Sequence, residues 1–286
     1  MRRLVLLALV TACGHPSSSS SSVPSQNGAA TPDGKLPVGP PLLTPGERMS
    51  YRVALQGFEL GVYTLAIAPE LQEVNGRKVA VMQGHAQALG VAAMIGGKVD
   101  DRFTSWIDVE TGRSLRFQTD EYGTRTNDIE HTIIELAQRQ GDTVPVTFHI
   151  NDDTPKPEPQ KAALPETWDY NGFLIAMRAW EAPPGTKHPL EVFRSRNLWH
   201  IDVTMRGKEK LDTELGELPA VRIDAHTYKL DRDGTKFKNT EERDFSLWIS
   251  DEAGRVPLQI NARTDYGDIK MRIVEYVPGT GEPLRK

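Results

Sequence analysis

Phe103-Thr104-Ser105-Trp106-Ile107, followed by Gly112-Arg113, returns later in the chain as Phe245-Ser246-Leu247-Trp248-Ile249, followed by Gly254-Arg255. The Phe, Trp, Ile, Gly and Arg keep both identity and spacing, and each intervening turn carries an acidic residue. This match predicts two related β units, each with a strand, a glycine-containing turn and a return strand. The alternative is that two unrelated hairpins have converged on the same residues. Because Phe and Trp are three positions apart, they should lie on opposite faces of the strand.

The remainder of the body also has the pattern of short strands. Residues 51–55 and 61–67 alternate apolar and polar side chains, as half-buried strands do. Asn75-Gly76 is a strong hairpin signal. Further strands are expected at 79–86, 102–108, 113–119, 129–136, 144–150, 191–195, 198–206, 219–230, 236–249, 256–264 and 268–277. Such regular spacing favours a mainly β fold of antiparallel curved sheets, arranged as a sandwich or an open-barrel-like sheet.

One central helix is expected at 167–181, between units at about 46–150 and 190–278. Thr167 is the expected N-cap, and Asp169 would lie in the first turn, where its charge suits the helix dipole. Apolar residues follow at helical spacing, namely Phe173, Leu174, Met177 and Trp180. Pro183-Pro184-Gly185 should end the helix, which we expect to cover an open end or a face of the sheet.

The N-terminus has the parts of a secretory signal. Basic Arg2 and Arg3 precede a short apolar run, which is well below the ~20 residues that span a bilayer. Val10-Thr11-Ala12-Cys13 resembles the lipobox of bacterial lipoproteins, in which the peptidase cuts before a cysteine that then carries lipid. Cys13 is the only cysteine, so it has no disulfide partner within the chain. The alternative is an ordinary signal peptide with a chance cysteine.

We therefore expect residues 1–12 to be a signal peptide, Cys13 to be the lipidation site, and the cell envelope to be the location. Gly14 stands where Asp would suggest inner-membrane retention, so the outer membrane is the expected destination. Residues 13–45 are rich in Ser, Pro and Gly and predict a disordered tether for the body at 46–278.

Composition limits the partners. The formal net charge is −5, and it becomes more negative once Arg2 and Arg3 are removed with the signal. A nucleic-acid ligand is therefore not expected. The expected partners are the membrane, through the lipid anchor, and an envelope protein, lipid or glycan of unknown identity.

Several stretches resemble domain-of-unknown-function family 3108, which consists of exported bacterial proteins. The opening 46–53, Gly-Glu-Arg-Met-Ser-Tyr-Arg-Val, looks like the start of that family, although Met49 stands where Leu is commoner. The central segment 168–178 and the closing 247–257 also resemble its motifs, in the family's order. The resemblance covers roughly residues 45–277. It implies a mostly antiparallel β fold in the cell envelope, and it implies no reaction, cofactor or catalytic residue.

Common catalytic and metal-binding patterns are missing from the sequence. His200 and Asp202 share a strand face but have no third ligand nearby in sequence. Residues 231–235 resemble a calcium loop, yet Gly234 occupies the fourth position instead of the sixth, which favours a hairpin turn. We expect no cofactor, no metal and no enzymatic activity. A carboxylate pair assembled in space remains an open alternative.

Arg178 is the candidate binding residue, together with Trp168 and Trp180. An arginine among aromatic side chains can hold an anionic or sugar-like group. The competing interpretation is a structural salt bridge to Asp169 or Glu181. The leading functional hypothesis is a non-catalytic lipoprotein that binds a ligand or partner. The alternatives are a lipid or lipoprotein carrier, which requires an apolar cavity between sheet and helix, and an envelope glycan hydrolase that uses two carboxylates.

Overall fold

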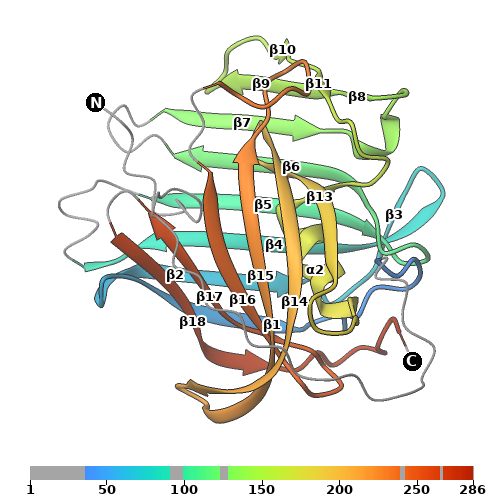
Figure 1. The fold of residues 1–286 in the computed structure, drawn as a ribbon. Coiled ribbons are helices and arrows are strands. Elements are labelled where there is room, and N and C mark those ends of the chain that lie inside the picture. Colours follow the sequence, from blue (N-terminus) through green and yellow to red (C-terminus); the bar gives the residue numbers. More distant parts are fainter. Residues whose placement is uncertain (1–35, 91–98, 123–127, 239–241, 265–266, 286) are drawn as a thin grey trace.

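The computed structural model describes residues 36–90, 99–122, 128–238, 242–264 and 267–285. Its main element is one strongly curved 16-stranded sheet that wraps around an α-helix (Figure 1). Along the sheet the strand order is β10-β9-β7-β6-β5-β4-β2-β1-β18-β17-β16-β15-β14-β13-β12, with β3 added beside β4. Every pairing is antiparallel except that of β12 with β13. The predicted mainly β, open-barrel-like fold with one central helix is confirmed.

The first half of the sheet consists of strands that follow one another along the chain. These are β1 (Arg48–Leu55), β2 (Phe58–Ile67), β3 (Gln72–Val74), β4 (Arg77–Ala88), β5 (Asp100–Asp108), β6 (Ser114–Tyr122), β7 (Ile129–Ile134), β9 (Val146–Ile150) and β10 (Lys156–Pro157). Between β7 and β9, β8 (Thr143–Val144) pairs instead with β11 (Gln160–Lys161) in a separate two-stranded sheet. The short 3-10 helix η1 (Leu136–Gln138) precedes β8. Asn75 and Gly76 both have positive φ, 52° and 76°, and they form the predicted two-residue turn between β3 and β4.

The second half of the sheet begins with β12 (Thr167–Asp169), which directly precedes the helix, and continues with the strands that follow it. These are β13 (Lys187–Arg194), β14 (Asn197–Thr213), β15 (Gly216–Lys229), β16 (Arg243–Ser250), β17 (Pro257–Thr264) and β18 (Gly267–Val277). The last strand, β18, pairs with the first, β1, and so joins the two halves into one sheet. Three expected bounds were wrong: β14 continues to Thr213, β16 begins only at Arg243, and the helix is shorter than 167–181.

The hairpins that carry the sequence repeat share a structural detail. The β5–β6 pairing shifts register between Trp106 and Ile107, and the β16–β17 pairing shifts between Trp248 and Ile249. Both are β-bulges or irregularities at the same point of the repeat. The division of the body into two related units stays a prediction.

The prediction that the Phe and Trp of the repeat lie on opposite faces of the strand is confirmed for Phe103 and Trp106. Phe103 is fully buried on the inner face, with its ring 6.4 Å from that of Tyr170. Trp106 points to the other face, where the Arg116 guanidinium lies 5.3 Å from its ring. At the matching tryptophan, Trp248, the Arg222 guanidinium also lies 5.3 Å away.

Helix α2 (Tyr170–Ala179) lies on the inner face of the sheet, with every residue from Asn171 to Arg178 buried (Figure 1). Its N-cap is Asp169, which accepts a hydrogen bond from Gly172 N at 2.8 Å. The predicted N-cap, Thr167, was wrong because 167–169 form β12 beside β13, so the helix cannot start earlier. Ser105 Oγ donates to the same Asp169 oxygen at 2.8 Å and ties the helix start to β5.

The helix end is held by a buried ion pair. Arg178 donates to both carboxylate oxygens of Glu47, at 3.1 and 2.8 Å, and to Gly254 O at 2.7 Å. The two side chains are only 2% and 1% exposed. Tyr276 of β18 also donates to Glu47, at 3.1 Å. One carboxylate thus connects the helix to the strands where the halves of the sheet meet.

The gap between the two sheet edges is bridged by the segment that leads from β10 to β12. Glu191 of β13 accepts from the backbone N–H groups of Ala163 and Leu164, both at 3.1 Å. Arg139 donates to Ala162 O and Leu164 O, both at 2.8 Å. These polar contacts and the short β8–β11 pairing therefore hold this side of the sheet together. No helix in the described ranges combines the length and apolar character that crossing a bilayer requires.

The Arg178→Met substitution should lower the free energy of unfolding by about 3–5 kcal/mol, because it leaves the Glu47 carboxylate buried without its cation. The double variant Glu47→Gln/Arg178→Met should recover part of this loss. Urea unfolding of the purified protein measures both.

The neighbouring pair Arg48–Glu275 provides the matched control. Its atoms are 3.1 Å apart, but both side chains are 50% exposed. Arg48→Met should therefore change the unfolding free energy by less than about 1 kcal/mol. Equal effects of Arg178→Met and Arg48→Met would contradict the structural role of the buried pair.

Candidate functional site

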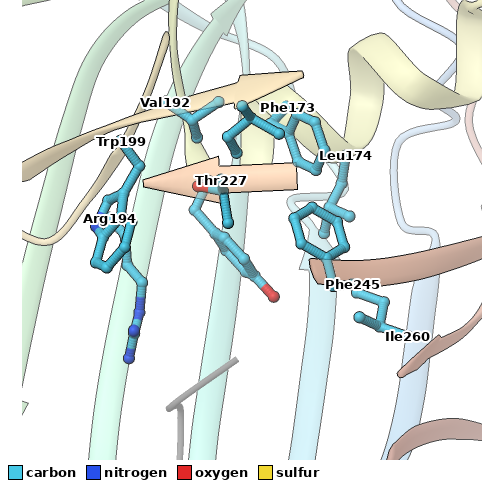
Figure 2. A pocket seen from close by; sticks show the side chains of 10 residues that line it. Phe173, Leu174, Val192, Arg194, Trp199, Thr227, Phe245 and Ile260 are labelled. Carbon is cyan, nitrogen blue, oxygen red and sulfur yellow. The ribbon is translucent and has the colours of Figure 1, made fainter. Parts of the chain in front are cut away.

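An apolar pocket lies between α2 and the second half of the sheet (Figure 2). Its volume is about 40 Å³, and it is half open. The lining residues are Tyr170, Phe173, Leu174, Val192, Arg194, Trp199, Ile201, Thr227, Phe245 and Ile260. In Figure 2, Arg194 and Trp199 lie at one side, and Phe245 and Ile260 lie at the other.

Strand alternation builds this pocket. Inner-facing residues of β13 to β17 supply one wall, because every second side chain points toward the helix. Helix α2 supplies the opposite wall with Phe173 and Leu174. The rings of Phe173 and Phe245 meet edge to face with centroids 6.2 Å apart. These large side chains fill most of the inner space and leave a small cavity.

Arg194, the last residue of β13, is the only charged residue in the pocket lining. Burial lowers the pKa of its guanidinium, and the nearby Glu121, Tyr170 and Asp101 partly oppose that shift. Within the described ranges, none of these acidic groups comes within ion-pair distance of Arg194. A partly buried cation without a close counter-ion is a natural point of attachment for an anion.

Three carboxylates lie on the inner face of the first half of the sheet. Glu121 of β6 stands directly opposite Glu130 of β7. Asp101 of β5 is 3% exposed and accepts a hydrogen bond from Tyr122 N at 2.9 Å. Burial, with the Glu121 charge as the second cause, raises the pKa of Asp101 to about 7. At neutral pH this carboxyl group is therefore partly protonated.

The pair Asp101 and Glu121 bears on the hydrolase alternative. Two neighbouring carboxyl groups, one of which has a raised pKa, have the general form of an acid/base pair. However, Asp101 is almost fully covered, and neither carboxylate lines the pocket in Figure 2. The arrangement gives a glycan no visible access to the pair.

The candidate residues predicted from sequence lie in three different environments. Arg178 is bonded to Glu47, so the expected salt-bridge partners, Asp169 and Glu181, were wrong. Trp168 is 2% exposed and lies beneath the Arg113 guanidinium, 4.1 Å from its ring. Trp180 is fully buried, with its ring 6.4 Å from that of His188. None of the three lines the pocket. Cys13 lies outside the described residues.

The two possible metal patterns have ordinary structural roles. His200 Nε2 lies 3.5 Å from Asp202 Oδ1, and its ring stacks on Tyr228 with centroids 4.9 Å apart. In the turn at 231–235, Asp233 accepts from the backbone N–H of Thr235 at 2.9 Å. Among the residues that the structure describes, no group of three or more His, Cys, Asp or Glu side chains could hold a metal ion.

A second, larger hollow lies on the sheet around β16 to β18 and the β1–β2 turn. This outer groove has a volume of about 740 Å³ and an open, mixed polar and apolar lining. Its charged lining residues are Arg222, Asp244, Arg263, Asp268 and Lys270. Arg222 is already paired with Asp224 at 2.8 Å. Positive and negative charges alternate here, so no one ligand charge is favoured.

Sequence reasoning missed Arg194 and Asp101, although a weak signal for each was present. Asp101 is two residues before Phe103, and Arg194 is two residues after Val192, so alternation places both on the inner face. Most residues that the strand pattern assigns to the core are apolar, so a charged residue at such a position marks a candidate functional site.

Asp101→Asn should remove a pH dependence of stability. Because the folded protein holds the Asp101 proton more tightly than the unfolded chain, the stabilisation is complete below about pH 4 and is lost as the pH rises to about 7. At pH 8 the variant should be more stable than the wild type by about 2–4 kcal/mol, and at pH 4 the two should match. Urea unfolding at several pH values measures this difference.

The exposed Asp153 supplies the control, since Asp153→Asn should leave the pH profile unchanged. A wild-type profile that stays flat between pH 4 and 8, or an Asp101→Asn profile that still falls, would contradict the assignment to Asp101.

Comparison with known proteins agrees with this fold. Among solved structures, the chain is similar to a beta-barrel-like protein of domain of unknown function DUF1849 from Brucella abortus, with a TM-score of 0.51 and 8% identity. The match covers 82% of this chain and 98% of that one. At this identity the likeness concerns the fold alone.

Two further structures match with lower scores. One is named "putative lipoprotein", from Parabacteroides distasonis, with 9% identity and a TM-score of 0.39 over 84% of this chain and 99% of that one. The other is named "putative exported protein with YmcC-like fold", from Bacteroides fragilis, with 6% identity and a TM-score of 0.33 over 84% and 99%. A search of curated proteins finds no match.

A family model described as "Protein of unknown function (DUF3108)" matches residues 49–274. That range includes α2 and runs from the first strand into the last. The resemblance noted in the opening, central and closing motifs is thereby confirmed, and the chain belongs to the DUF3108 family.

Proposed function

We propose that this protein is a lipid-anchored binding protein of the bacterial cell envelope, which takes a small ligand into the pocket beside α2 and performs no chemical step on it. The observation that carries the proposal is the half-open apolar pocket with one charged residue, Arg194, in its lining. Apolar pockets with a few placed polar groups are the usual form of small-molecule sites.

The anchor is argued from the sequence. The lipobox-like Val10-Thr11-Ala12-Cys13 follows a basic and apolar start, and a Ser- and Pro-rich stretch leads from it to the folded body. A lipid on Cys13, with each buried CH₂ worth about 0.8 kcal/mol, would hold the body at a membrane. Gly14, the residue after Cys13, favours the outer membrane as the site of anchoring.

The size of the pocket argues against the carrier alternative. A long acyl chain needs a continuous cavity, whereas this pocket has about 40 Å³ and is surrounded by packed side chains. A cavity of roughly 150 Å³ is needed for a molecule as small as benzene. The ligand we propose is therefore small, with only its apolar end inside the pocket. Binding of an envelope protein or glycan at the outer groove is a further candidate.

Cys13→Ala should abolish incorporation of labelled fatty acid and should move the protein from the membrane fraction to the soluble envelope fraction. Metabolic labelling and membrane fractionation of the expressed full chain measure the two effects. Ser19→Ala, within the same tether, should change neither. Unchanged labelling of the Cys13→Ala variant would remove the anchor from the proposal.

Val192→Phe should displace a ligand from the pocket. Val192 is 3% exposed and lines the cavity, so the larger ring would occupy the free volume at a stability cost of about 1–3 kcal/mol. Native mass spectrometry of the full-length protein should show a small bound molecule in the wild type and none in the variant.

Ile260→Phe fills the pocket from β17 and serves as an independent second variant. Urea unfolding checks that each variant is folded. The pocket would be ruled out as the ligand site if the wild type carried no bound molecule, or if folded variants retained it.

A further inference from the structure

We infer that the ligand of this pocket is a small anionic amphiphile, whose carboxylate or phosphate group binds Arg194 while its apolar end enters the space between α2 and β13–β17. This inference rests on the proposed function and adds the chemical class of the ligand. It is argued from the lining of the pocket, from the surroundings of Arg194 and from the distribution of charge on the inner face of the sheet.

The lining determines the two ends of the ligand. Apart from Arg194, the pocket is lined by apolar and aromatic side chains. Two of the lining residues, Tyr170 and Thr227, carry a hydroxyl group. An apolar group is therefore favoured in the interior, because burying it removes apolar surface from water. Figure 2 shows the Arg194 side chain extending from the pocket wall with its nitrogen atoms away from Phe173 and Leu174. The charged end of the ligand belongs there.

The unbalanced charge on Arg194 favours an anion. Its guanidinium is desolvated enough to lower its pKa, and Glu121 and Asp101 act on it only from beyond ion-pair distance in the described part of the chain. A guanidinium can form two parallel hydrogen bonds to a carboxylate or phosphate. An anionic ligand would supply a close partner that the described residues do not.

Charged groups outside the pocket lining modulate this binding. In the described part of the chain, Glu121 of β6 and Asp101 of β5 act electrostatically on Arg194, as does the Tyr170 hydroxyl of α2. Asp101 itself is next to Glu121 and Asp100, and it accepts from Tyr122 N. Protonation of Asp101 removes one negative charge from the neighbourhood of the ligand anion. Affinity for the anion should therefore rise as the pH falls from 8 to 6.

The test uses the full-length lipidated protein in lipid nanodiscs, with empty nanodiscs as the background. Four probes share one short chain, which suits a pocket of about 40 Å³, and differ in charge: propionate, propyl phosphate, propanol and propylamine. Binding is measured by equilibrium dialysis, and the part assigned to the pocket is the part that Val192→Phe or Ile260→Phe removes. Arg194→Gln is the test variant, and Arg206→Gln, an exposed arginine of β14 paired with Asp224, is the matched control.

The wild type and Arg206→Gln should bind propionate or propyl phosphate equally well. Arg194→Gln should bind that anion at least 10-fold more weakly but should keep its affinity for propanol. Asp101→Asn should remove the pH dependence of anion binding between pH 6 and 8.

Two results overturn the anion assignment and leave the proposed function standing. The first is equal binding of propionate and propanol with no effect of Arg194→Gln. The second is a preference for propylamine, which would assign the charged end to the carboxylates. If the pocket-filling variants change the binding of none of the four probes, the pocket is not the ligand site, and both the inference and the proposed function fail.

Discussion

The buried ion pair between Arg178 and Glu47 is the contact on which the rest of the structure depends. A helix enclosed by a sheet must satisfy its polar ends without water, since an unpaired buried charge costs several kcal/mol. Arg178 meets this requirement at the helix end by bonding Glu47 and Gly254 O. Glu47 precedes β1, and Gly254 lies in the β16–β17 turn. The same contact therefore fixes the helix and the junction between the first and last parts of the sheet, which Tyr276 of β18 completes.

The sequence repeat supplies the remaining contacts around the helix. Arg113 and Arg255 are matched residues of the two repeats, and both reach the central segment. Arg113 lies over Trp168, just before the helix, and pairs with Glu166. Arg255 donates to the carbonyl oxygens of Arg178 and Trp180, at the helix end. Two hairpins with the same bulge thus place one arginine at each end of α2, which explains why Gly-Arg recurs where the strand pattern alone requires no arginine.

Local patterns in the sequence predicted much of the fold, because strand alternation and turn residues act over a few positions. The Asn75-Gly76 hairpin, the opposite faces of Phe103 and Trp106 and the position of the helix between strands follow from such patterns. The helix start did not, because Thr167 is drawn into β12 by pairing with Glu191, a partner distant in sequence. The Glu47 partner of Arg178 was missed for the same reason. The site was largely unpredictable: Arg194 and Asp101 become neighbours only when the sheet curves, although alternation alone could have marked each as a charge on the inner face.

The helix is shorter than the strands that surround it, and this difference explains why Asp101 and Arg194 lie on the part of the inner face that the helix does not cover. A ten-residue helix is about 15 Å long, whereas the nine residues of β5 extend for about 30 Å. The helix therefore covers only part of the inner face. Asn171, at its first turn, already contacts Phe103 O at 2.9 Å, and Asp101 lies two residues further along β5. On the other wall, Asp169 pairs with Phe193, and Arg194 follows at the strand end. The charged residues thus lie beyond the first turn of the helix, and the apolar pocket lies beside the helix itself. An amphiphile placed across that boundary would match both environments, because its apolar end would lie against α2 and its anionic end against Arg194.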